Sequence, residues 1–380
     1  MHVIGLIAEY NPFHNGHLYQ IKMIKNLYPD SIIVSVISSS FTQRGDVSIL
    51  NKWDKTKIAL NYGIDIVLEL PFVYATQSAD IFAKGAIAIL KELKIDTLVF
   101  GTESISIDKI IKVAKFQLEN KKYNEVLKRY LKKGMNYPTA TNKAIENLIG
   151  IRIDKPNDLL ALAYIREVFV QKMKVSIRNI PRTNDYHSTK VKGKIASATA
   201  IRKSFLENAS INKLIPYKEE YLYKLSMNNY FPYLKYKILL EGNSIKRYQS
   251  VDEGIENRIL KYLEVAQDYN DLIMKIKTKR YTYNKISRIL LHILIGFTKE
   301  DAKKINLDYL RILGFSQNGQ EYLNKIKKEI TLPIITGYKK NISKILDIEL
   351  MATKIYSLEI DPSLIKREYQ IKPIIKDIKL

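Results

Sequence analysis

Two histidines near the start of the chain, His14 and His17, stand three residues apart across Gly16. They follow an apolar stretch and Pro12 and precede a helical pattern, so both imidazoles are expected at the N-terminus of a helix. Unpaired backbone N–H groups and the helix dipole favour a polyphosphate there, and the glycine allows a close approach of the backbone. We predict that both rings donate hydrogen bonds to phosphate oxygens as charge builds up during attack at an α-phosphorus.

The alternative to this phosphate site is a surface turn that carries two incidental histidines. The order of strand, proline, glycine and helix argues against it, because each stands where a strand-to-helix phosphate turn needs it. A metal site is not expected, since no carboxylate or third histidine stands at ligand spacing nearby. The chain has no cysteine, which excludes disulfides, thiolate zinc sites and cysteine nucleophiles.

A second candidate phosphate site lies at residues 197–203. Ser197 and Thr199 precede a helical pattern that contains Arg202 and Lys203. Hydroxyls and backbone N–H groups at a helix start can bind phosphate oxygens, and the two cations add positive charge. The alternative is an N-capped helix with exposed basic residues.

Three single residues are weaker candidates for nucleotide contacts. Gly101 directly follows a strand pattern, where a missing side chain would let adenine or ribose approach the backbone. Asn157 opens a helix and could meet a ribose or a base edge, although an ordinary Asn-Asp helix cap is equally consistent. Arg182 follows the last predicted strand and could hold phosphate, stack on a base or make a surface ion pair.

Alternating strand and helix patterns fill residues 1–205 and predict an α/β domain with a parallel sheet. Beyond residue 206 the alternation fades, which predicts a mainly helical C-terminal domain over 206–380. A lysine-rich helical insertion is expected at about 105–150. In the first part we expect strands at 3–9, 31–37, 65–70, 97–100 and 175–177 and helices at 17–27, 52–61, 79–93 and 159–170. In the second part we expect helices at 217–225, 255–265, 283–295 and 342–356 and extended pieces at 310–313 and 332–335.

The composition is that of an ordinary globular protein, with 46% hydrophobic and 27% charged residues among 380. The net charge of +23 suggests a polyanionic partner, although a Lys-, Ile-, Asn- and Tyr-rich bias would also raise it. Basic clusters with interleaved tyrosines could bind RNA phosphates and stack on bases, or could be solvated helix faces. We expect a cytoplasmic protein with no membrane contact, because no signal-peptide or membrane-spanning pattern is present.

The stretch from His14 to His17 resembles the His-x-Gly-His motif of the nucleotidylyltransferase superfamily, which shares its fold with class I aminoacyl-tRNA synthetases. The flanking residues are similar to the bacterial tRNA(Met) cytidine acetate ligase family. Further segments that resemble that family are residues 41–46, 52–55, 69–80 and 310–315. The chain departs from the family pattern at Ser39-Ser40, Ala161 and Ser188, which leaves open whether its acceptor pocket is typical.

The resemblance implies a Rossmann-like nucleotidylyltransferase core over 1–205 that binds ATP, and a basic domain over 206–380 that binds tRNA. It implies that His14, His17 and Arg202 are catalytic. It also implies that Ser197 and Thr199 close over the β- and γ-phosphates. The ATP-binding positions that it assigns are Ile7, Ala8, Glu9, Tyr10, Asn11, Pro12, Phe13, His14, Asn15, Gly16, His17, Leu18, Tyr19, Gln20, Gly101, Asn157 and Arg182.

The activity that the resemblance implies is ATP-dependent acetylation of tRNA. Acetate would be activated as acetyl-adenylate and transferred to N4 of the wobble cytidine of elongator tRNA(Met), with Mg²⁺ accompanying the triphosphate. Arg44, with Gln43 and Gln77-Ser78, could bind the acetate or could be structural. One alternative activity is a small-molecule adenylyltransferase that makes a dinucleotide-type cofactor. Another is a nucleotide-sensing RNA-binding protein without catalysis.

Overall fold

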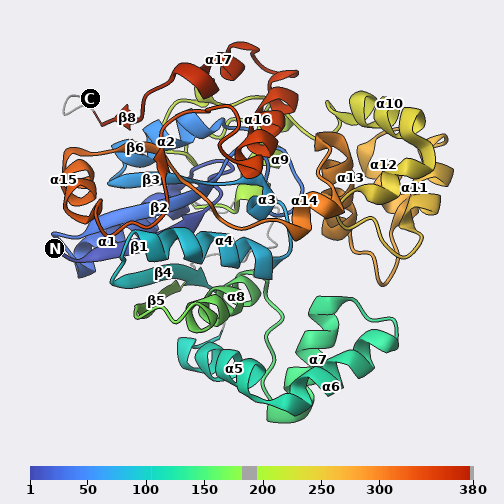
Figure 1. Cartoon of the computed structure of the whole chain (residues 1–380), viewed down its shortest axis with the longest axis horizontal. Coiled ribbons are helices and arrows are strands. Elements are labelled where there is room, and N and C mark those ends of the chain that lie inside the picture. The colour runs from blue at the N-terminus through green and yellow to red at the C-terminus, as the bar shows by residue number, and fades with distance from the viewer. Residues whose placement is uncertain (104, 182–194, 377–380) are drawn as a thin grey trace.

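The computed structural model describes residues 1–103, 105–181 and 195–376, which form a mixed α/β structure (Figure 1). Within these residues an eight-stranded sheet has the order β5-β4-β1-β2-β3-β6-β7, with β8 beside β6. Strands β1 to β5 are parallel, β6 runs antiparallel to β3, and β7 and β8 are parallel to β6. The strands are β1 (Val3–Ala8), β2 (Ile32–Ser38), β3 (Ile66–Leu70), β4 (Thr97–Thr102), β5 (Ser176–Pro181), β6 (Leu310–Phe315), β7 (Ile334–Ile335) and β8 (Ile374–Ile375).

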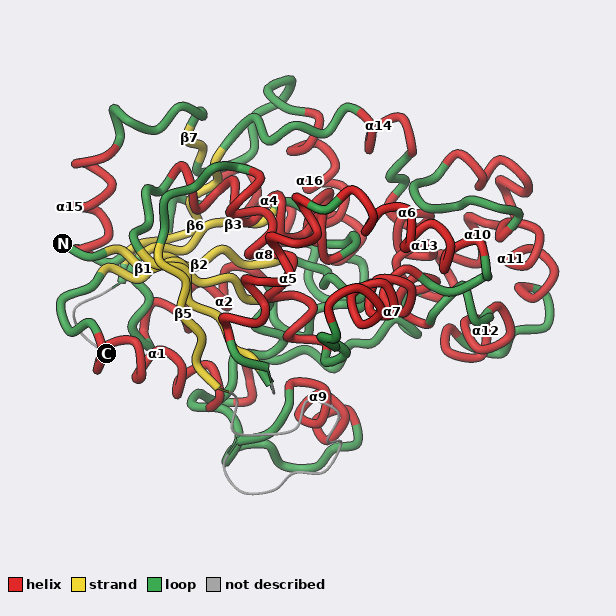
Figure 2. The backbone as a smooth tube through the Cα atoms, turned by 90° about the horizontal axis from the view of Figure 1, so that it is seen from below, coloured by secondary structure: helices red, strands yellow, loops and turns green. Residues whose placement is uncertain are grey.

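Helices cover both faces of this sheet, as Figure 2 shows from below. Alternate residues of β2 enter two different cores: Ile33 packs with residues of α1, α2 and α9, and Val34 packs with residues of α4 and α8. The helices are α1 (Asn15–Leu27), α2 (Lys52–Asn61), α3 (Phe72–Ala75), α4 (Ala79–Glu92), α5 (Ile107–Glu119), α6 (Lys121–Lys132), α7 (Tyr137–Ile149), α8 (Pro156–Val170), α9 (Ala198–Leu206), α10 (Phe231–Glu241), α11 (Ile255–Leu263), α12 (Tyr269–Ile276), α13 (Tyr283–Ile295), α14 (Lys299–Lys303), α15 (Gln317–Ile326), α16 (Lys344–Ser357) and α17 (Ser363–Gln370).

The predicted α/β class with a mostly helical C-terminal region is confirmed. Figure 1 shows α10 to α13 grouped beside the sheet and α5 to α7 below it. The sheet nevertheless contains strands from both predicted domains, because β6, which follows residue 206, pairs with β3. The helix predicted at 217–225 is wrong, because only the 3-10 turn Glu219–Tyr221 forms there. Beyond it the N–H of Tyr223 donates to the carbonyl of Ile49 at 2.9 Å, so the segment bonds to the core instead of to itself.

Five buried charged side chains join the last two helices to the sheet. Lys52 Nζ lies 2.6 Å from carboxylate oxygens of Glu69 and Glu368. Arg311 lies 2.6 Å from Glu368 and 3.3 Å from Glu69, and Glu349 lies 3.5 Å from Lys52. Burial, together with the neighbouring carboxylates, raises the pKa of Glu349 to about 7. This cluster connects α2, β3, β6, α16 and α17. Each charge is compensated by a neighbour, and removing one would leave another buried without a partner.

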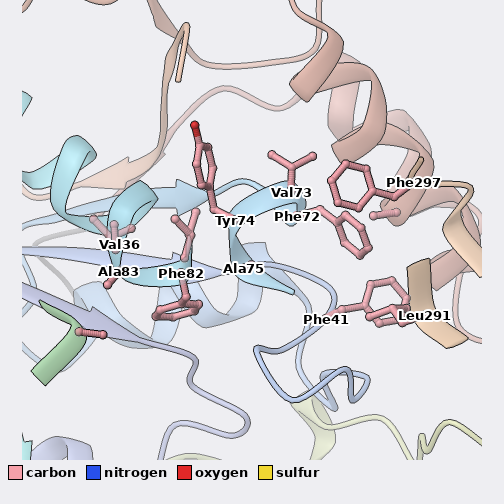
Figure 3. Close-up of a cluster of buried hydrophobic side chains, with 14 of the residues drawn as sticks. Val36, Phe41, Phe72, Val73, Tyr74, Ala75, Phe82, Ala83, Leu291 and Phe297 are labelled. Carbon is pink, nitrogen blue, oxygen red and sulfur yellow. The ribbon is translucent and has the colours of Figure 1, made fainter. Parts of the chain in front are cut away.

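An aromatic cluster fixes α13 against the core (Figure 3). Phe72 lies between Phe41 and Phe297, with edge-on ring centroid distances of 6.0 Å and 6.2 Å. Leu291 from α13 packs at the same place. Helix α13 therefore has a fixed position against the loop that follows β2.

The buried His292 on α13 makes two further contacts with the core. Its Nδ1 lies 3.1 Å from the carbonyl of Gln249, and its Nε2 lies 2.9 Å from that of Thr76. Burial lowers the pKa of His292 from 6.5 to about 4. Between pH 4 and pH 6.5, His292 is therefore protonated in the unfolded chain and neutral in the folded chain.

We therefore expect the free energy of unfolding to decrease as the pH falls from 6.5 towards 4. The contribution of His292 to this slope is at most about 1.4 kcal/mol per pH unit. Urea unfolding of the wild type and of His292→Gln at pH 7, 5.5 and 4.5 measures it. The variant should show the shallower slope, and equal slopes would contradict the assignment.

Candidate active site

A cavity of about 1110 Å³ opens at the carboxyl ends of β1, β4 and β5. From β1 the chain continues to β2 on one side and returns later to β4 on the other, so the strand order reverses here. Open α/β sheets bind ligands at this position. The volume is above the ~300–1,000 Å³ of a typical small-molecule site, which leaves room for more than one substrate.

His14 and His17 lie at the start of α1 and line this cavity. The N–H of Gly16 donates to Nδ1 of His14 at 3.0 Å, and the N–H of His14 donates to Nδ1 of His17 at 3.1 Å. A neutral ring that accepts at Nδ1 carries its proton at Nε2, so these bonds select the same tautomer for both rings. The rings stack with centroids 3.9 Å apart. The turn thus holds two N–H donors side by side.

The residues around the two rings hold them in place. A Cβ on Gly16 would lie 2.8 Å from Cε1 of His14, so only glycine leaves the His14 ring its position. On the other side the Tyr10 ring meets His17 edge-on at 4.9 Å, and Phe13 lies 5.5 Å from it. Both aromatic rings are buried in the core beneath α1. The imidazole positions are therefore fixed by the packing as well as by hydrogen bonds.

Helix α9 brings the second predicted phosphate element to the same cavity. Ser197 caps the helix by accepting from the N–H of Ala200 at 3.1 Å, and Ser197, Thr199 and Arg202 line the cavity. The guanidinium of Arg202 donates to the carbonyl of Asn11 at 2.8 Å and lies 3.4 Å from the carboxylate of Asp46. Arg202 is thereby held next to the turn that carries the histidines.

A charged group lies at the end of β1, where Glu9 lines the cavity. Its carboxylate accepts from the N–H of Gln43 at 2.6 Å. Burial raises the pKa of Glu9, and the Gln43 N–H and the Arg44 guanidinium oppose the rise. Gln43, Arg44 and Gln77 also line the cavity, so the residues predicted as either acetate-binding or structural do reach it.

Gly101 and Asn157 face the cavity from the opposite side of β1. The side chain of Asn157 donates to Glu103 at 2.6 Å, and the carboxylate of Asp158 accepts from the N–H of Glu103 at 2.7 Å. These bonds hold the end of β4 against the start of α8. Asn157 is therefore held in a fixed orientation beside Gly101.

The structure places most of the predicted site residues around one cavity, and some do not reach it. Pro12, Phe13, Asn15 and Leu18 do not line the cavity: Phe13 is buried, and the Asn15 side chain donates to the carbonyl of Lys213 at 2.9 Å. Arg182 lies outside the described residues. The predicted residues that line the cavity are Ile7, Ala8, Glu9, Tyr10, Asn11, His14, Gly16, His17, Tyr19, Gln20, Gly101, Asn157, Ser197, Thr199 and Arg202.

Sequence reasoning missed two parts of the cavity wall. Helix α7 and the turn before it contribute Asn136 and Tyr137, and α13 contributes Asn284, Lys285 and Arg288. No local motif marks these residues. Their only signal was a basic and aromatic composition, which helix surfaces share.

Two features are absent from the described part of the chain. None of its helices combines the length and the apolar character that a membrane span requires. Its His, Asp and Glu side chains form no group of three or more that could hold a metal ion.

Comparison with known proteins adds to this geometry. The family model for HIGH nucleotidyl transferases matches residues 1–370. A tRNA(Met) cytidine acetate ligase of Clostridium kluyveri is 39% identical over 99% of this chain and 100% of the relative. One from Bacillus velezensis is 36% identical over 95% of this chain and 93% of the relative.

Solved structures agree with these sequence matches. The apo crystal structure of Thermotoga maritima TmcAL superposes with a TM-score of 0.90 at 29% identity, covering 99% of both chains. The same protein bound with alpha-thio ATP gives a TM-score of 0.87 at the same identity and coverage. The chain therefore belongs to the HIGH nucleotidyl transferases and, within them, to the tRNA(Met) cytidine acetate ligase family.

Proposed function

We propose that this protein is an ATP-dependent ligase that acetylates N4 of the wobble cytidine of elongator tRNA(Met), releasing AMP and pyrophosphate. The observation that carries the proposal is the stacked pair His14 and His17, two N–H donors of one tautomer at a helix N-terminus in the cavity. The relatives that match over the whole chain supply the acceptor, since they are named for cytidine in tRNA(Met) and for acetate.

In the first step ATP lies across the carboxyl edge of the sheet with its triphosphate over the two imidazoles. A carboxylate oxygen of acetate attacks the α-phosphorus, and the bond to the pyrophosphate oxygen breaks, so acetyl-adenylate and pyrophosphate form without a proton transfer. The imidazole N–H groups and the N-terminus of α1 stabilise the charge that develops on the α-phosphoryl oxygens. Ser197, Thr199 and Arg202 hold the departing pyrophosphate.

In the second step the exocyclic amine of cytidine attacks the acetyl carbonyl. A carbon–nitrogen bond forms, the bond from the acetyl carbon to the phosphate oxygen breaks, and AMP leaves while the amine loses a proton. The amine is a weak nucleophile because its lone pair is delocalised into the ring, so a mixed anhydride is a suitable donor. N4-acetylcytidine is the product.

The remaining predicted contacts belong to the same proposal. Gly101, Asn157 and Arg182 complete the contacts to the nucleotide. Mg²⁺ would arrive with the triphosphate and neutralise part of its charge, because Mg²⁺ binds mainly to substrate phosphates and water.

The tRNA would reach the cavity from the side of α7 and α13, whose residues complete its wall. The net charge of +23 favours a polyanionic partner. A tRNA substrate places the reaction in the cytoplasm.

The test is an incubation of the purified protein with ATP, carbon-labelled acetate and total bacterial tRNA, followed by digestion to nucleosides. Label in N4-acetylcytidine that requires both ATP and tRNA is the expected result. No label in RNA, with ATP still cleaved when phosphorylated cofactor precursors are added, would contradict the proposal and favour a small-molecule adenylyltransferase.

A further inference from the structure

We propose that Arg288 of α13, together with Arg44, forms the subsite that binds the carboxylate of acetate. This inference rests on the proposed ligase function. It assigns a substrate-binding role to a helix of the C-terminal half that none of the phosphate motifs includes. The argument starts from the surroundings of Arg288.

Arg288 is a partly buried cation in the cavity wall. One guanidinium nitrogen donates to the carbonyl of Gln43 at 3.2 Å. Within the described residues no carboxylate lies within ion-pair distance of this guanidinium, and none of its nitrogens is both fully buried and without a hydrogen bond. Its other N–H groups are therefore accessible from the cavity. A partly buried cation without a paired anion is less stable than a paired one, so this position favours an anionic ligand.

The carboxylates of Glu9 and Asp46, near Arg288, already have other cationic neighbours. Glu9 and Arg44 attract each other: Arg44 opposes the rise in the pKa of Glu9 that burial causes, and Glu9 opposes the fall in the pKa of Arg44. Asp46 is paired with Arg202 at 3.4 Å. Arg288 and Lys285 are cavity-lining cations of α13 for which the described residues supply no ion pair, and burial lowers the pKa of Arg288 to about 10, which leaves it charged at neutral pH. Arg288 is bonded to the loop that carries Arg44, and its planar guanidinium matches the geometry of a carboxylate such as acetate.

The loop of residues 42–46 and α13 are bonded to each other, so Arg44 and Arg288 belong to neighbouring backbone segments that line one cavity. The hydroxyl of Ser287 donates to the carbonyl of Gly45 at 2.8 Å. Gly45 has a φ of +79°, and a Cβ there would lie 2.6 Å from the backbone nitrogen of Arg288. The backbones are thus in direct contact, which fixes Arg288 relative to Arg44.

The position of Arg44 relates this subsite to the phosphate element. A second cavity of about 360 Å³ is lined by Arg44, Thr199 and Arg202, and the same three residues also line the large cavity. Arg44 therefore stands beside the residues proposed to hold the triphosphate. A carboxylate held by Arg44 and Arg288 lies on the side of the α-phosphorus that faces α13.

Arg288 could instead bind an RNA phosphodiester or a phosphate of ATP. Kinetic measurements show which of the three substrates it binds. Pyrophosphate release is measured with acetate, ATP or tRNA as the varied substrate and the other two saturating. For Arg288→Gln we expect the KM for acetate to rise about 10- to 100-fold, the range for a lost charge-assisted hydrogen bond. The KM values for ATP and tRNA should change less than about threefold.

Three further variants distinguish ligand binding from support of the loop. Ser287→Ala removes the other α13 bond to the loop and should leave the KM for acetate near the wild-type value. Lys261→Gln removes an exposed cation of α11 outside the cavity and should also leave this KM unchanged. Arg288→Lys keeps the charge but loses the planar fork, so an intermediate KM is expected even if the glutamine variant folds poorly.

Each other outcome is informative. A rise in the KM for tRNA or ATP alone would overturn the acetate subsite and assign Arg288 to that substrate. An equal rise in Ser287→Ala would show that only the loop position matters. Wild-type protein that releases no pyrophosphate in response to acetate would contradict the proposed function itself, before any variant is compared.

Discussion

Replacing His17 by alanine is expected to lower kcat for acetate-dependent pyrophosphate release by about 100- to 1000-fold, the usual effect of removing one preorganised donor. The Nδ1 of His17 accepts the backbone N–H of His14, which leaves the proton of the neutral ring on Nε2, the atom proposed to donate to a phosphoryl oxygen. Because that oxygen gains charge only as acetate attacks, the KM for ATP should change much less than kcat.

His2→Ala is the matched control for this variant. His2 precedes β1 at the opposite edge of the sheet and stacks on Tyr28 with centroids 4.8 Å apart, so its loss should leave kcat unchanged. His17→Gln retains an N–H donor and should recover part of the lost rate. A His17→Ala enzyme with wild-type kcat would remove this residue from the catalytic site.

Replacing Lys52 by methionine is expected to reduce the free energy of unfolding by about 3–5 kcal/mol, as for other buried ion pairs that lose one partner. Lys52 is 1% exposed and lies 2.6 Å from both Glu69 and Glu368. Without its charge, Glu69 and Glu368 share the guanidinium of Arg311, and Glu349 loses the cation 3.5 Å away. Denaturant unfolding of the two proteins at the same pH measures the difference.

Lys57→Met is the control, because Lys57 is on the same helix but exposed. It should change the free energy of unfolding by less than about 1 kcal/mol. If the two variants were equally stable, the charge cluster would not contribute to holding the C-terminal helices on the sheet.

Local sequence signals predicted the parts of the fold that local interactions form. The apolar runs of β1 and β2 give buried parallel strands, and α2 begins after Asn51, whose side chain accepts from two backbone N–H groups of the helix. The motif of His14 and His17 likewise depends on hydrogen bonds between residues two and three apart. The residue pattern that marks these features is local, although the strands pair with partners further along the chain.

The rest of the candidate site depends on contacts across long separations in the chain. Arg288 meets Gln43 across 245 residues, and Arg311 meets Glu69 across 242. The helix predicted at 217–225 is wrong for the same reason, because Tyr223 bonds to Ile49 instead of to its own neighbours. Periodicity carries no signal for such pairs.

By itself, the sequence determined the α/β core, the turn with two histidines at a helix start and the basic character of the chain. Periodicity, capping and composition are properties of neighbouring residues, so these features follow directly from the residue order. Only the tertiary structure decided that β6 joins the core sheet antiparallel to β3 and that α13 closes the cavity. Burial and charge pairing act between whatever side chains the packed chain brings together, and that packing placed Arg288 of the second half beside the loop of the first.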